Sequence, residues 1–153
     1  MDIKSDLKKI YENRLLESED EVQEFEESLA KVLDYGDVSV IPDLCRAFDD
    51  DTEQFEVMFG LVHGIERLYK NNIEEGLTYI AIAVPEILSR AEEWVEILHY
   101  RILNHPEVRL AYRNVLSKLD SSIVVNIKDL LTEIKNEDPD MFSVSVDEVI
   151  SDI

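Results

Sequence analysis

The chain has 153 residues, and 35 acidic side chains against 15 Lys and Arg give it a formal net charge of −20. A surface this negative repels nucleic acid, anionic lipid and phosphorylated substrates, and it attracts basic proteins. A single cysteine, Cys45, excludes an internal disulfide and a multi-cysteine metal cluster, which favours a reducing compartment.

The length predicts one globular domain spanning residues 1–153. Its 45% hydrophobic content is ordinary for a folded protein. The chain is acidic almost from its first residue, so we expect no cleavable leader. The most apolar window, 79–84, is too short to span a membrane and is followed by Pro85. These features predict a soluble, cytoplasmic protein.

Apolar residues recur at helical spacing in almost every segment, beginning with a first helix over 3–15. The capping-box pattern at 18–21 opens a second helix, which Gly36 is placed to end in a left-handed conformation. A short third stripe covers 41–48. These signals predict three helices before the first strong break in the pattern.

The acidic run at 49–51 makes that break, and Asp51 or Thr52 is expected to cap a fourth helix. This helix should turn five apolar residues inward: Phe55, Met58, Phe59, Val62 and Ile65. A fifth helix begins near Asn72, and Pro85 must end or kink it because proline has no N–H for the helical ladder.

The Ser89 to Glu92 box predicts a sixth helix, and Pro106 stands near the start of a seventh that runs to Leu119. Asp120 or Ser121 is expected to cap an eighth helix that continues to Ile134. After a polar break, residues 142–146 alternate like a strand, but a lone strand would have nothing to pair with. We therefore expect an extended lead-in to a last helix.

The fold class predicted from these elements is all-α, with about eight or nine helices joined by short turns. Two architectures fit: stacked antiparallel helical hairpins of HEAT-like form, or an irregular helical bundle. Helix pairs recur at intervals of roughly forty residues, near the HEAT period, which favours the stacked hairpins.

Metal and catalytic sites have little support. His63 and Glu66 have the three-residue spacing of helical metal sites, but the other histidines, His99 and His105, add no ligand at a recognisable spacing. Cys45 lies on an apolar stripe, as a buried structural thiol would. The serines lie mostly at helix starts, where capping explains them, and there is no glycine-rich phosphate loop. We expect neither an enzyme nor a cofactor or metal.

Two charged residues stand close to buried stripes. A partly buried arginine needs a carboxylate or carbonyl partner, so we expect Arg101 to pair with Glu66 across two helices. The same region has two glycines, Gly60 and Gly64, inside a helix, where each costs about 1 kcal/mol relative to Ala. Close approach of a neighbouring helix would offset that cost. Trp94 lies on an apolar stripe and should be a buried anchor.

The segments 58–66, 91–94 and 101–104 resemble a bacterial immunity-protein family, immunity protein family 30 of the polymorphic toxin systems. The likeness runs over about residues 55–120. It implies a predominantly helical protein, without catalysis, that binds and neutralises one cognate toxin. Within these motifs we assign structural roles to His63, Trp94, Arg101 and Asn104.

The resulting hypothesis is a cytoplasmic immunity protein that occludes a basic toxin domain, for example a nuclease, with an acidic surface. Residues 1–57 hold eighteen acids against six bases, so this region is the expected contact surface. The expected partner-binding residues are Asp49, Asp50, Asp51, Glu53, Glu66, Glu92 and Glu93. The alternative is an acidic regulator that mimics nucleic acid and titrates a basic protein.

Overall fold

The computed structural model describes residues 3–151 and 153. This part of the chain folds into eight α-helices and one short 3₁₀ turn, and contains no strand. The elements are α1 (Ile3–Glu12), α2 (Glu19–Tyr35), η1 (Val38–Val40), α3 (Ile41–Cys45), α4 (Phe55–Asn71), α5 (Ile73–Leu103), α6 (Pro106–Leu116), α7 (Ser121–Glu137) and α8 (Pro139–Ile150).

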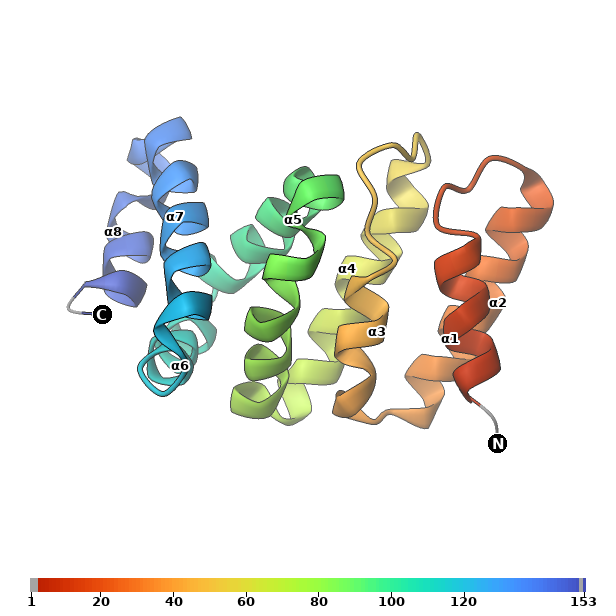
Figure 1. Cartoon of the computed structure of the whole chain (residues 1–153), viewed down its shortest axis with the longest axis horizontal. Helices are drawn as coiled ribbons and strands as arrows, with labels where there is room; N and C mark the ends of the chain where they lie inside the picture. Colours follow the sequence, from red (N-terminus) through yellow and green to blue (C-terminus); the bar gives the residue numbers. More distant parts are fainter. Residues whose placement is uncertain (1–2, 152) are drawn as a thin grey trace.

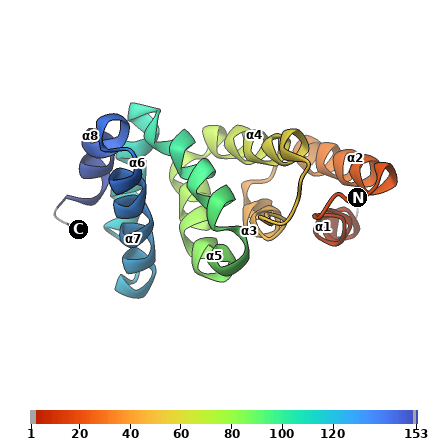
Figure 2. The same ribbon diagram turned by 90° about the horizontal axis from the view of Figure 1, so that it is seen from above.

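The helices stand side by side in two layers. The first layer holds α1, α3, the first half of α5, and α7; the second holds α2, α4, α6 and α8 (Figures 1 and 2). Each helix packs on its hairpin partner and on the adjacent hairpin, from α1 and α2 at one end to α7 and α8 at the other. The predicted all-α stack of hairpins is confirmed.

Two of the predicted helix ends are confirmed in detail. The Ser18 hydroxyl accepts a hydrogen bond from the Glu21 N–H at 3.2 Å, which caps α2. Gly36 ends the same helix with φ +74°, a left-handed conformation that glycine adopts without a Cβ penalty. No described helix is long and apolar enough to cross a membrane.

Pro85 does not end its helix, so this part of the prediction is wrong, whereas the new helical start predicted at the Ser89 to Glu92 box is confirmed. The chain remains helical through Pro85 and breaks six residues later, at Ala91 (φ −141°, ψ 31°). The reason is tertiary: the loop that precedes α4 lies against this bend, and the Asp50 N–H donates to the Arg90 carbonyl at 2.9 Å. The loop supplies partners for backbone groups that the helix can no longer pair.

The start of α4 and the final segment also differ from expectation. Gln54, rather than Asp51 or Thr52, is the N-cap residue of α4, and its side chain makes no capping bond. Thr52 instead accepts the Gln54 N–H at 3.3 Å. The strand-like run 142–146 lies within α8, because Phe142, Val146 and Val149 share one buried helical face.

Candidate protein-docking surface

Eight of the exposed acids lie at one edge of the stack. The α1–α2 loop, the loop that precedes α4 and the bend of α5 all lie at the same edge, the upper one in Figure 1. We call the exposed carboxylates there the acid edge: Glu17, Glu19, Asp20, Asp51, Glu53, Glu56, Glu92 and Glu93. Several stand at the first turns of α2, α4 and the second half of α5, where a helix N-terminus favours negative charge.

The loop over residues 49–52 lies at this edge but points two of its carboxylates inward. Asp49 is 5% exposed; it forms an ion pair with Arg14 at 3.1 Å and accepts the Asp51 N–H at 3.0 Å. Asp50 accepts the N–H groups of Glu93 and Trp94, at 3.1 and 3.3 Å. Its carboxylate therefore caps the helix that restarts after Ala91.

The predicted Glu66–Arg101 pair is present between α4 and α5. The guanidinium of Arg101 donates to both carboxylate oxygens of Glu66, at 3.1 and 3.3 Å. The Glu66 side chain is only 7% exposed, whereas that of Arg101 is 40% exposed. A buried carboxylate that receives two such bonds holds the register of the two helices.

An aromatic stack runs from the core to the surface beside the acid edge. Phe48 is fully buried and stacks on Trp94 at a ring-centroid distance of 6.3 Å. Trp94 is 3% exposed, as predicted. Its outer side meets Phe55 and Phe59 of α4, at 6.4 and 5.0 Å.

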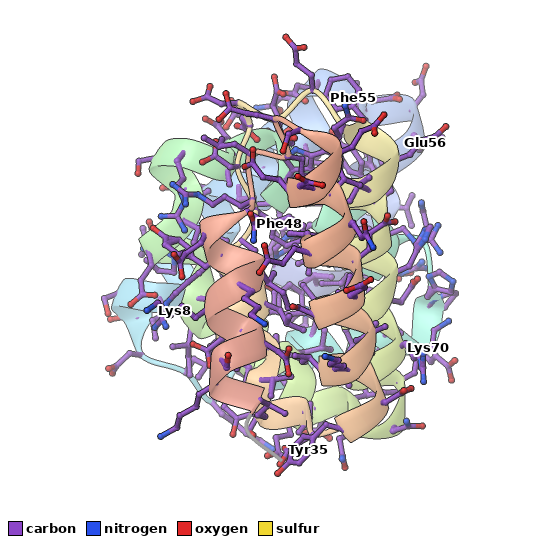
Figure 3. The ribbon with its side chains drawn as sticks, turned by 90° about the vertical axis from the view of Figure 1, so that its right-hand side faces the viewer. Lys8, Tyr35, Phe48, Phe55, Glu56 and Lys70 are labelled. Carbon is purple, nitrogen blue, oxygen red and sulfur yellow. The ribbon has the colours of Figure 1, made fainter. Side chains whose placement is uncertain are left out.

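The prediction that α4 buries both of these phenylalanines is wrong. Phe55 is 58% exposed and Phe59 is 38% exposed. Phe55 opens α4 at the upper end of the molecule, as the end-on view in Figure 3 shows. The helical spacing could not separate these two from the core residues Met58 and Val62, because all four lie within one broad apolar arc.

Three further residues that the sequence analysis named are His63, Asn104 and Cys45. His63 is exposed on α4, with its ring 6.4 Å from that of Phe59. Asn104 is the exposed C-cap of α5, and its N–H donates to the Tyr100 carbonyl. Cys45 is a buried thiol, as predicted, and burial raises its pKa to about 12.

His99 is a buried polar residue that the sequence did not single out. Its Nδ1 lies 2.7 Å from the Val95 carbonyl oxygen and its Nε2 lies 2.7 Å from the Tyr112 hydroxyl. Burial lowers its pKa to about 4. His99 is thus a neutral link between α5 and α6.

A second acidic cluster forms where α5 meets α7. The carboxylates of Glu92, Glu96 and Glu133 lie within 4.8 Å of one another, a grouping that could hold a cation. Glu96 is 8% exposed and hydrogen-bonded by the Tyr100 hydroxyl at 3.3 Å. Burial, together with the charges of Glu137, Glu133 and Glu92, raises its pKa to about 7. Crowding on this scale favours a protonated Glu96 near neutral pH.

An open groove of about 630 Å³ lies between the start of α2 and the start of α4. Val22 contributes an apolar side chain, and Gln54 closes the groove on the α4 side. Most of the other lining residues are acids: Glu17, Glu19, Glu26 and Glu27. The groove has the chemistry to receive a long basic side chain, with its aliphatic stem against Val22 and its charge among the carboxylates.

Comparison with known proteins adds a family. The family model described as Immunity protein 30 matches residues 12–112, which is more than half of the chain. The match begins and ends earlier than the stretch 55–120 on which the likeness was noted, and it includes the α1–α2 loop, the loop before α4 and the α5 bend. No curated protein and no solved structure matches the chain.

Proposed function

The chain belongs to the Immunity protein 30 family, which implies an immunity protein against a toxin, and we propose that it neutralises a basic toxin domain by covering that domain's active site. Family membership is the observation that carries the proposal. The acid edge and the chain's net charge of −20 also support the proposal, because a negative surface attracts a positively charged domain. A toxin that grips phosphates, such as a nuclease, has the required basic surface.

The contacts are assigned by exposure. Of the acids expected to bind the partner, we place Asp51, Glu53, Glu92 and Glu93 at the interface, because all four are exposed on the acid edge. Asp49, Asp50 and Glu66 have partners within the fold. Their proposed role is to position the loop and helices that present the exposed acids.

In this proposal the inhibition is stoichiometric and not catalytic. One chain occupies one toxin domain, and protection persists while the complex persists. The whole chain acts as one cytoplasmic domain in a polymorphic toxin system. This differs from an acidic nucleic-acid mimic, which would titrate basic proteins of the host without a dedicated toxin.

The direct test uses the toxic domain of a candidate toxin whose gene adjoins the gene for this chain. Co-expression should protect cells, and titration of purified toxin activity should end at one chain per toxin domain. Protection at far below one equivalent would indicate catalysis. Failure to bind that domain, combined with binding to unrelated basic proteins, would favour the mimic.

Association kinetics test the electrostatic part separately. The association rate should fall as salt rises, because the screening length is about 8–10 Å at physiological ionic strength. The dissociation rate should change less, since desolvated central contacts are screened less than contacts at the rim. An association rate that is flat across the salt series would remove the acid edge from the mechanism.

A further inference from the structure

The outer face of α4 is exposed although it has the composition of an interface. Phe55, Glu56, Phe59 and His63 all lie exposed on this helix. The rings of both phenylalanines lie against the ring of Trp94, which supports them on their inner side. Rigid aromatic side chains lose little conformational entropy on binding and are enriched at the centres of protein interfaces.

Gly60 adds an independent observation on the same face. A Cβ at Gly64 would lie 2.9 Å from the Leu33 side chain, so close packing of α2 accounts for that glycine. A Cβ at Gly60 would meet nothing within 4 Å. Close approach of a neighbouring helix therefore accounts for Gly64 and does not account for Gly60. Glycine destabilises a helix interior relative to alanine, and within the described residues nothing packs at Gly60 to offset this.

The charges around this face select the kind of partner. At the start of α4, Glu53 and Glu56 flank Phe55, and the acidic groove begins at the neighbouring Gln54; the exposed bases Arg67 and Lys70 lie toward the other end of the helix. A second copy of this chain would carry the same net charge of −20, which opposes self-association. A basic segment complements both the ridge of exposed aromatics and the groove beside it.

We propose that the outer face of α4 is the central contact for a basic segment of the toxin domain. Phe55 and Phe59 pack against the aliphatic parts of its side chains, and Gly60 admits its backbone at close range. One long basic side chain enters the groove between α2 and α4. This inference rests on the proposed function and names the surface that performs it.

The test measures, by calorimetry, the affinity of the toxin domain identified by the protection assay above for matched surface variants. Phe55→Ala and Gly60→Trp should each weaken binding by at least about tenfold. Tyr35→Ala is the control, because Tyr35 is 50% exposed and lies at the opposite edge of the molecule (Figure 3). Its affinity should equal that of the wild type.

Stability measurements keep the test decisive. Gly60→Ala should raise the melting temperature, because the added Cβ meets no neighbour and alanine favours the helix. If Gly60→Trp fails to fold, Phe55→Ala and Phe55→Ser, which both remove the exposed ring of Phe55, still test the face. A wild type that does not bind the toxin domain overturns the proposed function itself.

A wild type that binds, with Phe55→Ala, Phe55→Ser and Gly60→Trp binding equally well, overturns only the assignment of α4. Sedimentation tests whether a second copy of this chain occupies the outer face of α4 instead. A dimer of this chain that Gly60→Trp separates, with toxin affinity unchanged, would assign the face to self-association and overturn the proposal.

Discussion

The loop 49–52 and the segment 17–27 are both rich in acids and lie on the same edge. Their carboxylates nevertheless make different contacts. Asp49 and Asp50 of the loop bind Arg14 and the N–H groups of the restarted α5. Those of Glu19 and Glu26 remain at the wall of an open groove, next to Glu27, which accepts a hydrogen bond from Gln23. Local composition therefore does not separate acids that hold the fold from acids that are free to meet a partner.

The difference has a geometric cause. The loop crosses the bend of α5, where backbone N–H groups have lost their helical acceptors, so a carboxylate there has a donor to satisfy. The start of α2 already has its cap in Ser18. Its acids gain only the weaker attraction of the helix dipole.

The largest effect on stability should come from Trp94. Asp50 accepts its backbone N–H, and the ring of Phe48 stacks on its indole. Trp94→Ala should lower the free energy of unfolding by about 3–5 kcal/mol, because a large buried side chain is removed. Denaturant unfolding followed by circular dichroism measures this. Phe55→Ala, at the exposed end of the same stack, is the control and should change stability far less.

The loop itself should show the next largest effect. Asp50→Ala removes the cap from the second half of α5 and should cost about 1–2 kcal/mol of unfolding free energy. Glu24→Ala, at an exposed site in the middle of α2, should stay within about 0.5 kcal/mol of the wild type. Equal costs for the two variants would contradict the division between held and free acids.

Glu96 tests the second acidic cluster, between α5 and α7, where crowding makes a charged acid unfavourable. Its pKa is about 7 in the folded protein against 4.5 for an ordinary glutamate, so its contribution to stability is present below pH 4.5 and is lost as pH rises to 7. Glu96→Gln should therefore stabilise the protein at pH 8, by about 1 kcal/mol after allowance for solvent screening. The gain should vanish near pH 4.5, and melting curves at the two pH values measure it. A gain of equal size at both values would show that charge is not the cause.

The smallest effect on stability is expected for the exposed acids next to the held ones. Asp51→Asn combined with Glu53→Gln should leave the unfolding free energy within about 0.5 kcal/mol of the wild type. The same pair should slow association with the toxin domain at low salt. An unchanged association rate would remove these two residues from the proposed interface.

Helical periodicity was enough to predict the all-α class, the stacked hairpins and the buried position of Trp94. The capping residues Ser18 and Gly36 were also recognisable, because caps depend on contacts within a few residues. The Glu66–Arg101 pair could be predicted as well, since a carboxylate and a guanidinium near buried stripes need each other. Each of these signals is local or follows from the cost of burying a charge.

The tertiary structure decided that the helix continues through Pro85, which acids are held and which aromatics are exposed. The Ser89 to Glu92 box did predict the restart near Ala91, but only the fold shows the loop some forty residues earlier that supplies the replacement hydrogen bonds. Phe55 and Phe59 have the same spacing as core residues, yet they are exposed because, among the described residues, no helix covers them. A sequence records which side chains can be buried or bonded; the neighbours that bury or bond them come from distant segments, and these meet only in the folded chain.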